Sequence, residues 1–223
     1  MDQRFATDWF LLGHAGAAPG AVSYLGPDWT GTAGTEVLAV ADGRVVSTGD
    51  GIPDEPVGGW GASGTVMNWE TIGGNAITLD LGEARFAWYG HLQAGSLRVQ
   101  PGDTVRRGQV LGLIGNSGAT TAPHLHFQIT DSATLGKGRG LAFVFECFDL
   151  MARTDSRVQW TGEGELYLQP ADDQRRKLET PLGGAVVFFP EAPGSDAESG
   201  CDGWHRNSRL TRARQVPGRL LDS

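Results

Sequence analysis

Apolar and polar residues alternate with a period of two along much of the chain. The alternation is clearest in NAITLDLG (75–82) and in ARFAWYGHL (84–92), which are separated by a short turn. A period of two places successive side chains on opposite faces of a strand, so each segment is predicted to form a half-buried β-strand. No segment keeps a sustained helical period. The pattern therefore predicts an all-β protein made of antiparallel strands.

Turn-forming residues mark the ends of further predicted strands. Residues 36–50, EVLAVADGRVVSTGD, contain two β-branched runs on either side of Asp42-Gly43. This pair favours a hairpin, because both residues tolerate positive φ. Residues 51–74 are rich in proline, glycine and tryptophan and are interpreted as a long insertion. Three other segments have strand-like sequences, namely 4–12, 96–115 and 123–130.

One hydrophobic core is expected for the 223 residues, since single cores usually stop growing near ~250 residues. We expect a β domain over residues 1–190, with its core at 34–130 and added strands within 157–190, for example RVQW, GELYLQ and GAVVFF. From 191 to 223 apolar residues are few, arginines are numerous and no alternation remains. Such a segment buries too little apolar surface to offset the entropy of ordering, so a disordered tail is predicted.

Composition excludes several classes of partner and location. The formal net charge of -8 argues against nucleic acid as a partner, because phosphate binding depends on a basic surface. No apolar run approaches 18 residues, and the run Trp9–Leu12 is too short for the apolar part of a signal peptide. The sequence therefore predicts neither a membrane span nor an export signal. With only Cys147 and Cys201, a framework of disulfide bonds is not expected.

The strongest local signal for chemistry is the sequence His124-Leu125-His126. Residues two apart on a strand project from the same face, so the two imidazoles are predicted to point to the same side. This arrangement suits metal binding or proton transfer. An arbitrary His-x-His pair more often lies on a solvated strand face, so the chemical interpretation depends on further residues.

His91 and Asp8 are those further residues. His91 ends the alternating run FAWYGHL and meets the His-x-His face if the two strands are neighbours in one sheet. Asp8 lies within the apolar segment FATDWFLL, where an unpaired buried carboxylate is costly. We expect Asp8 to coordinate a cation, to accept several hydrogen bonds or to lie at an exposed edge. The residues alone leave these alternatives open.

The order and spacing of four segments resemble the core of the lysostaphin-type zinc metalloendopeptidase family. These segments are GTEVLAVADGRVV, GNAITLDLG, FAWYGHL and VQPGDTVRRGQVLGLIGNSGATTAPHLHFQI. The resemblance covers about residues 34–130, and PLGGAVVFFP (181–190) resembles an extension found in a longer subgroup. It implies a groove over an antiparallel β-sheet, the β-barrel-sandwich-like duplicated hybrid motif, and one bound Zn2+.

The resemblance also implies roles for the histidines. In the family pattern the second histidine of the His-x-His pair binds zinc, so His126 is the implied ligand. His124 and His91 are implied to orient and deprotonate the attacking water and to stabilise the oxyanion, work that suits neutral imidazoles near pH 7.

An aspartate is the other zinc ligand that the resemblance implies. We favour Asp8, because RFATDW resembles the apolar-Ala-x-Asp-aromatic form of the longer subgroup and has the better strand context. Asp28 is the competing candidate, since Tyr24 to Asp28 has the family's His-x3-Asp spacing with tyrosine in place of histidine.

The family's first histidine ligand has no match in the sequence. No histidine precedes Asp8, so either the chain begins inside the domain or the metal site is incomplete. His14 is a substitute candidate, but its glycine- and alanine-rich surroundings predict a loop histidine.

The function implied by the resemblance is a zinc-dependent endopeptidase that cleaves peptidoglycan cross-bridges or similar glycine-containing peptides. The alternative is a catalytically inactive binding or regulatory module of the cell envelope that keeps the fold and lacks the metal. His91 and the His-x-His pair favour the enzyme, and the missing first histidine favours the alternative. The resemblance implies a secreted or envelope location, and we expect a monomer.

Overall fold

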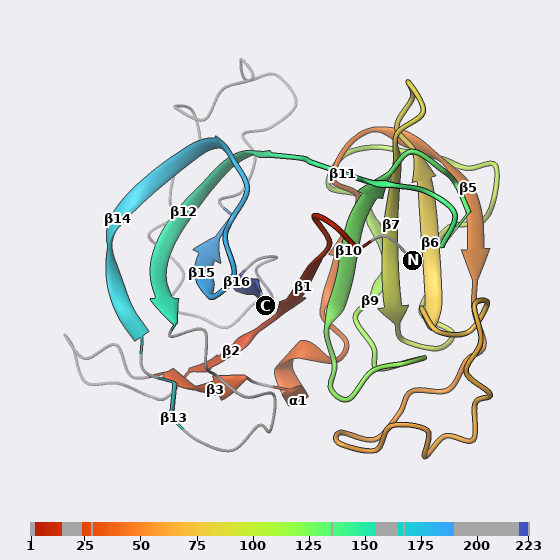
Figure 1. Cartoon of the computed structure of the whole chain (residues 1–223), viewed down its shortest axis with the longest axis horizontal. Coiled ribbons are helices and arrows are strands. Elements are labelled where there is room, and N and C mark those ends of the chain that lie inside the picture. Colours follow the sequence, from red (N-terminus) through yellow and green to blue (C-terminus); the bar gives the residue numbers. More distant parts are fainter. Residues whose placement is uncertain are drawn as a thin grey trace. The chain divides into compact units, whose positions relative to one another are not determined.

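The computed structural model describes residues 3–14, 24–27, 29–134, 136–154, 165–166, 168–189 and 219–222. Nearly all regular elements in these ranges are strands, and the strand pairs whose register is known are antiparallel (Figure 1). The one helix among them, α1 (Trp29–Thr32), is a single turn. The predicted all-β, antiparallel fold class is confirmed. No helix in these ranges is long and apolar enough to cross a membrane.

The chain divides into two compact units, each described by itself. Unit 1 comprises Met1–Phe10 and Asp28–Ala142, and unit 2 comprises Leu11–Pro27 and Phe143–Ser223. The predicted domain boundary near residue 190 lies outside the described residues, so it stays a prediction.

The main sheet of unit 1 has the strand order β1-β10-β7-β6-β5-β8, with β11 paired to β10, and it does not close into a barrel. Its strands are β1 (Thr7–Phe10), β10 (Leu125–Thr130), β7 (Phe86–Leu92), β6 (Asn75–Asp80), β5 (Gly43–Gly49), β8 (Thr104–Val105) and β11 (Gly140–Leu141). The predicted hairpin of residues 75–92 is confirmed, because β6 pairs with β7 across their connecting turn.

The predicted hairpin around Asp42-Gly43 is wrong. Strand β4 (Glu36–Leu38) pairs with β9 (Val110–Leu113) in a separate two-stranded sheet, whereas β5 pairs with β6 and β8. The physical reason is a long-range contact: Asp42 Oδ1 accepts a hydrogen bond of 2.8 Å from the amide of Arg107. Asp42 therefore joins two separate chain segments and does not close a local turn.

The core of unit 1 lies beneath the strands that carry the site. Many of its most buried large side chains come from β4, β5, β6, β7, β9 and the segments that follow them. They include Val37, Val45, Ile77, Leu79, Tyr89, Leu92, Leu111 and Ile114. Tyr89 also accepts a hydrogen bond of 3.0 Å from the amide of Val40, which ties the chain after β4 to β7.

Residues 51–74, the predicted insertion, form a long connection between β5 and β6. Its beginning is held by backbone hydrogen bonds of 2.7 Å from Glu55 to Asn116 and from Gly58 to Thr121. The nearly buried carboxylate of Glu55 accepts hydrogen bonds from the amide and the hydroxyl of Ser63. These contacts fix the start of the connection against the segment that precedes β10.

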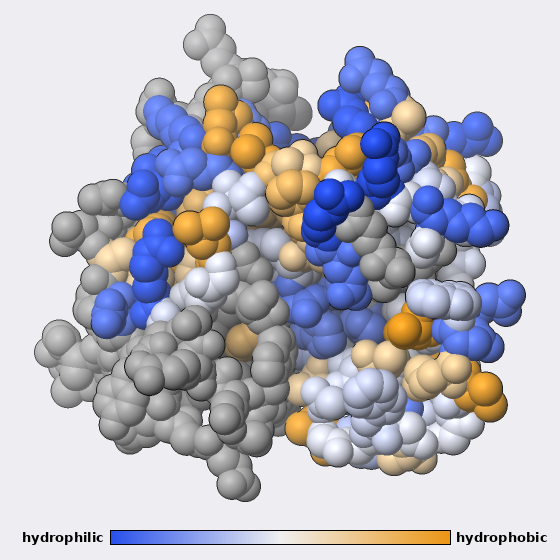
Figure 2. All heavy atoms as spheres, in the orientation of Figure 1, coloured by the Kyte–Doolittle hydropathy of each residue, from blue (hydrophilic) through white to orange (hydrophobic). Residues whose placement is uncertain are grey.

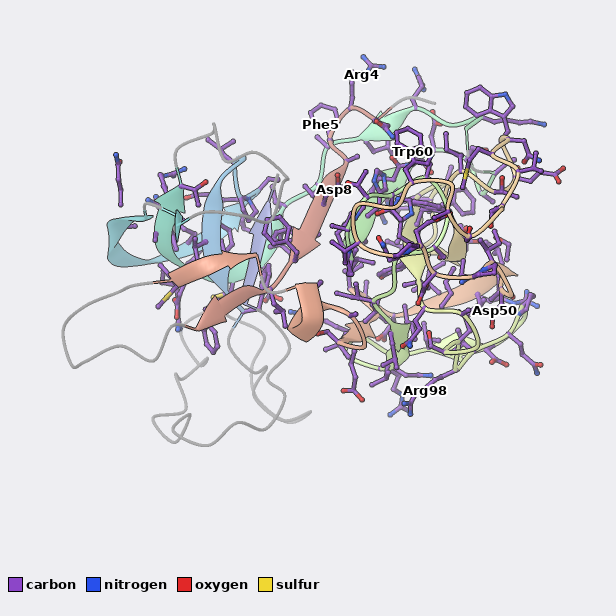
Figure 3. All side chains as sticks on the ribbon, turned by 90° about the horizontal axis from the view of Figure 1, so that it is seen from below. Arg4, Phe5, Asp8, Asp50, Trp60 and Arg98 are labelled. Carbon is purple, nitrogen blue, oxygen red and sulfur yellow. The ribbon has the colours of Figure 1, made fainter. Side chains whose placement is uncertain are left out.

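The surface of this connection differs from the rest of unit 1. Figure 2 shows it, at the lower right, as mostly pale spheres of intermediate hydropathy with single apolar side chains among them. In Figure 3 it crosses in front of the sheet, with Asp50 at its start and Trp60 farther along. Four large apolar side chains on it are exposed, namely Val57, Trp60, Val66 and Trp69.

Unit 2 contains two sheets. One has the order β14-β12-β15-β16, with strands β14 (Leu168–Glu179), β12 (Phe145–Thr154), β15 (Ala185–Phe188) and β16 (Arg219–Asp222). The other has the order β13-β3-β2, with strands β13 (Glu165–Leu166), β3 (Tyr24–Pro27) and β2 (Leu12–His14). His14 thus ends a strand, and its prediction as a loop residue is wrong, because β2 pairs with β3.

The added strands predicted within 157–190 are found in part. Strand β15 matches the predicted GAVVFF, and the predicted RVQW at 157–160 lies outside the described residues. Of the predicted tail at 191–223, the structure describes β16, which pairs with β15. Cys147 on β12 is buried and disulfide-bonded, and Cys201 lies outside the described residues.

Candidate active site

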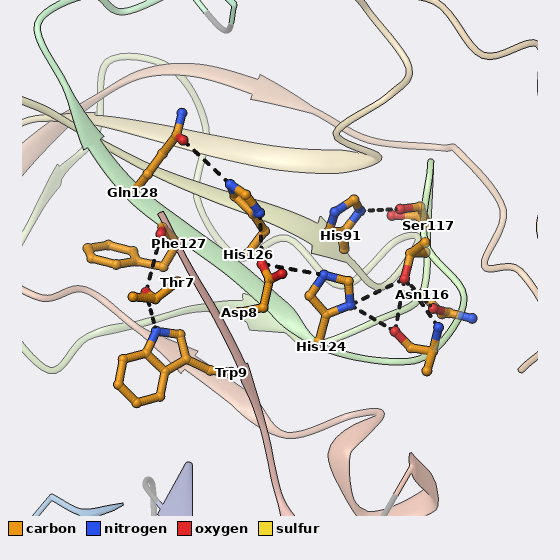
Figure 4. Close-up of polar contacts among 12 residues, drawn as sticks. Thr7, Asp8, Trp9, His91, Asn116, Ser117, His124, His126, Phe127 and Gln128 are labelled. Atoms are coloured by element: carbon orange, nitrogen blue, oxygen red, sulfur yellow. Dashed lines mark hydrogen bonds and ion pairs between the residues drawn. The ribbon is translucent and has the colours of Figure 1, made fainter. Parts of the chain in front are cut away.

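The register of three neighbouring strands brings Asp8 and His126 together. Asp8 on β1 is the direct antiparallel partner of His126 on β10. On the other side of β10, His126 lies opposite Gly90 of β7. Asp8, His126 and the end of β7 therefore form one row across the sheet (Figure 4).

His91 reaches this row through a β-bulge in β7. Asn75 of β6 pairs with Leu92, and Ile77 pairs with Tyr89, so β7 has one residue more than β6 between the two pairs. His91 takes up the irregularity with a φ of 58°, which is uncommon for a residue other than glycine. Bulges of this kind change the direction of a side chain, often beside functional sites.

The bulge decides which side of the sheet His91 occupies. In a regular strand His91 would share a face with Tyr89, whose ring packs against Phe127 in the core. Instead its ring centroid lies 4.6 Å from that of His124 and 6.0 Å from that of His126. The structure thus brings the three histidines that the sequence singles out to one place.

Asp8 Oδ1 is the atom on which this cluster converges. It lies 2.8 Å from His126 Nδ1 and 3.7 Å from His124 Nε2. His124 stands just before β10, which begins at Leu125. The histidines 91, 124 and 126 are 6%, 8% and 6% exposed, so their rings lie largely out of bulk water. Figure 4 shows Asp8 between the rings of His124 and His126.

Backbone carbonyl groups fix the tautomers of two of the histidines. His91 Nδ1 lies 2.8 Å from the carbonyl oxygen of Ser117, and His124 Nδ1 lies 2.8 Å from that of Ala122. A carbonyl oxygen can only accept a hydrogen bond, so each Nδ1 carries the proton and donates it. In both neutral rings Nε2 is therefore the basic nitrogen.

His126 lies between Asp8 and Gln128. Its Nε2 lies 3.5 Å from Oε1 of the buried Gln128, an acceptor, and this contact favours a proton on Nε2 and a lone pair on Nδ1. Its Nδ1 lies 2.8 Å from Asp8 Oδ1, which is buried and has no hydrogen-bond donor among the described residues. A cation bound to both Nδ1 and Asp8 Oδ1, or a proton on Nδ1, balances the charge of the carboxylate.

Burial and neighbouring charges set the protonation of the cluster. Burial, with the charges of His124 and His126, lowers the pKa of His91 to about 3. Burial also lowers the pKa of His124, although Asp8 opposes this effect. The pKa of Asp8 is raised by burial but lowered more by His126 and His124, and it lies below its usual value. At neutral pH the site therefore holds neutral His91 and His124 beside an ionised Asp8.

The donor chemistry of this pair fits zinc. A carboxylate oxygen and an unprotonated imidazole nitrogen are common zinc ligands, and Gln128 beside His126 supplies the outer hydrogen bond typical of a metal-binding histidine. In the described part of the chain no group of three or more His, Cys, Asp or Glu side chains has the geometry of a complete metal site. Asp8 and His126 therefore supply two donors for a metal ion. The other two candidate ligands, Asp28 and the side chain of His14, lie outside the described part of the structure.

Two backbone segments cross closely behind His91. A Cβ atom placed on Gly74, which has a φ of 65°, would lie 2.2 Å from the carbonyl oxygen of Ser117, the group that fixes His91. At Gly64, with a φ of 78°, an added Cβ meets nothing within 4 Å. The two positions therefore separate backbone strain from steric collision.

Replacing Gly74 with alanine is expected to destabilise the protein more than replacing Gly64. Both changes place a Cβ at positive φ, which costs about 1 kcal/mol, and the collision at Gly74 adds a further 1–3 kcal/mol, roughly. Urea unfolding of Gly74→Ala and of the control Gly64→Ala measures the difference. Equal free energies of unfolding would contradict the close crossing behind His91.

Comparison with known sequences gives the family to which this chain belongs. Residues 23–137, just over half of the chain, match the sequence model of Peptidase family M23. The chain belongs to peptidase family M23, and the resemblance inferred from the sequence is confirmed.

Individual relatives match part of the chain. Glycyl-glycine endopeptidase ALE-1 of Staphylococcus capitis is 36% identical over 107 residues, which are 48% of this chain and 24% of that protein. The murein hydrolase activator EnvC of Escherichia coli is 32% identical over 96 residues, which are 43% of this chain and 18% of that protein. The chain thus spans about a quarter or less of the curated relatives it matches.

Solved structures also match. The catalytic domain of lysostaphin from Staphylococcus simulans is 27% identical, with a TM-score of 0.35, and the match covers 59% of this chain and 84% of that chain.

The sequence identified the four clustered side chains but not the groups that hold them. Gln128 could have been found, because it is two residues from His126 and shares its face of β10. The carbonyl groups of Ser117 and Ala122 leave no signal in the sequence, because every residue has a carbonyl oxygen.

Proposed function

We propose that the chain is a zinc-dependent endopeptidase that cleaves glycine-containing peptides of the peptidoglycan cross-bridge type. In this proposal Asp8 and His126 bind zinc, and His91 and His124 are the catalytic histidines. The observation that carries it is the convergence of His126 Nδ1 and His124 Nε2 on the buried Asp8 Oδ1.

Zinc in such a site supplies Lewis acidity, which polarises a peptide carbonyl and makes water more acidic. The chain supplies the proton transfers and the orientation. His91 and His124 each have a basic Nε2 in a nearly dry site, where they accept hydrogen bonds from the attacking water and take up its proton. The carbonyl groups that bind their Nδ1 atoms keep both rings in this orientation.

The substrate proposal comes from the relatives. ALE-1 is named a glycyl-glycine endopeptidase, and a glycine-rich peptide, which has no side chains, fits a substrate that must approach buried catalytic groups closely. Action on peptidoglycan would place the protein in the cell envelope or outside the cell. We also propose that it acts as a monomer, because all four side chains belong to unit 1 of one chain.

A second candidate is a catalytically inactive module that binds or regulates in the cell envelope. Two observations favour it: the described residues provide no complete three-donor metal cluster, and one relative is named a murein hydrolase activator. Metal content distinguishes the two functions, because the inactive module needs no zinc.

Metal removal tests the proposed function directly. The purified chain, supplied with zinc, is expected to cleave pentaglycine and to leave pentaalanine intact, with products identified by mass spectrometry. A chelator is expected to abolish the cleavage, and added zinc is expected to restore it, because the histidines alone do not polarise the carbonyl. Cleavage that persists after chelation would show a chemistry that does not need zinc. A chain that neither binds zinc nor cleaves glycine peptides would support the second candidate.

A further inference from the structure

We propose that Thr120 and Asn116 are positioning residues that set the tautomer and the ring plane of His124. Their effect on turnover rests on the proposed peptidase function, whereas their effect on the imidazole does not. Both residues are buried, at 4% and 3% exposure. They form a hydrogen-bonded path that ends at Nδ1 of His124 (Figure 4).

The direction of each hydrogen bond on this path follows from proton counting. Asn116 Nδ2 donates to the carbonyl oxygen of Glu55 at 2.7 Å, which turns Asn116 Oδ1 toward Thr120 as an acceptor. The Thr120 hydroxyl has one proton, which it can donate to Asn116 Oδ1 or to the carbonyl oxygen of Ala122, each at 2.9 Å. In either case its lone pairs remain available to accept the Nδ1 proton of His124 at 3.2 Å.

Thr120 provides a second hydrogen-bond acceptor for His124 Nδ1, in addition to the carbonyl oxygen of Ala122. One acceptor at 2.8 Å fixes which nitrogen carries the proton but leaves the ring able to rotate about that contact. A second acceptor at 3.2 Å, from a different direction, restricts the ring plane as well. The plane matters, because it directs Nε2 of His124 toward Asp8 Oδ1, 3.7 Å away.

The path is anchored on the connection 51–74. The amide of Glu55 donates to the carbonyl oxygen of Asn116 at 2.7 Å, and the amide of Asn116 donates to Asp54 Oδ1 at 3.1 Å. Asn116 therefore has its backbone and its side chain fixed by neighbouring residues of that connection. A rigid acceptor at Asn116 Oδ1 in turn orients the Thr120 hydroxyl.

Nuclear magnetic resonance of the histidine side chains tests this role in the full chain. With 15N-labelled histidine at neutral pH, His124 is expected to show a protonated Nδ1 and an unprotonated Nε2. Thr120→Val removes the acceptor and leaves Asn116 Oδ1 without its donor, so mixed tautomers or exchange broadening are expected at His124. Thr120→Ser keeps the hydroxyl and is expected to restore the single tautomer.

Turnover is the second measurement. Thr120→Val is expected to lower kcat about 10–100-fold, the usual scale for outer hydrogen-bond partners, with KM and zinc content little changed. Asn116→Ala is expected to have the same effects in smaller measure, since the Ala122 carbonyl can still accept the hydroxyl proton. Thr104→Val makes the same chemical change at an exposed threonine of β8 and is expected to keep the native spectrum and kcat.

Two results would overturn the proposal. One is a native His124 tautomer and native kcat in Thr120→Val, and the other is a failure of Thr120→Ser to restore them. If Thr120→Val does not fold, Asn116→Ala provides the same two readouts. A peptidase-inactive chain that still shows the tautomer change would refute the proposed function and leave the positioning role intact.

Discussion

Replacing His126 with alanine is expected to remove both bound zinc and peptide cleavage. Among the described residues, His126 Nδ1 and Asp8 Oδ1 are the two proposed metal donors that lie together. An open catalytic site that loses one of its ligands holds zinc too weakly. Zinc content after gel filtration and cleavage of pentaglycine are measured on the same preparation. Asp8→Asn is expected to give the same result, because the amide lacks the negative charge.

His14→Ala is the matched control for this experiment. His14 ends β2, which belongs to unit 2, whereas the clustered histidines belong to unit 1. The control is expected to keep its zinc and its activity. Zinc loss in His14→Ala together with zinc retention in His126→Ala would show that the ligands are misassigned.

Replacing His124 or His91 with alanine is expected to leave zinc in place and to lower kcat by about 10²–10⁴-fold, the usual scale for a lost acid-base group. Each ring contributes a basic Nε2 that the carbonyl groups of Ala122 and Ser117 hold in place. The division of roles therefore predicts normal zinc content with slow turnover, measured on the same preparations.

His91 needs an additional variant, because its φ of 58° is unfavourable for alanine. Asparagine tolerates positive φ better, so His91→Asn removes the imidazole with less backbone strain. Both variants are expected to lose similar amounts of activity. A nearly active His91→Asn chain would mean that His91 matters for the backbone, and loss of zinc in His124→Ala would show that His124 is a ligand.

The alternation of residues predicted the sheet that holds the site. β6 and β7 pair as the alternation of residues 75–92 indicates, and Asp8 lies in a strand as the segment 4–12 suggested. The His-x-His pair points to one side, as the contacts of His124 and His126 with Asp8 Oδ1 show. These features depend on local periodicity and on which residues are apolar, and both are visible in one sequence.

The position of His91 could not be derived from that periodicity. Because His126 pairs with Gly90, strict alternation would place His91 beside Tyr89, on the core face. A bulge of one residue turns the side chain of His91 to the opposite face. The bulge is held by two hydrogen bonds from His91: its amide donates to the carbonyl oxygen of Gly73, and its ring donates to that of Ser117. Such long-range contacts leave no periodic signal.

Strand pairing over long distances was also invisible in the sequence. β14 is largely polar, yet it pairs with β12, and Arg175 forms an ion pair of 2.8 Å with the buried Asp149 directly opposite. Asp42 similarly binds the amide of Arg107 and does not close the predicted hairpin. In both places a partner far along the chain determines the structure, whereas local propensity is a weak guide.

X-ray diffraction from crystals grown with zinc, measured on both sides of the zinc absorption edge, locates the bound metal. One strong anomalous peak is expected in contact with both His126 Nδ1 and Asp8 Oδ1, beside Nε2 of His124. A chain with no peak at saturating zinc, or with its peak away from Asp8 and His126, would contradict the proposed metal site.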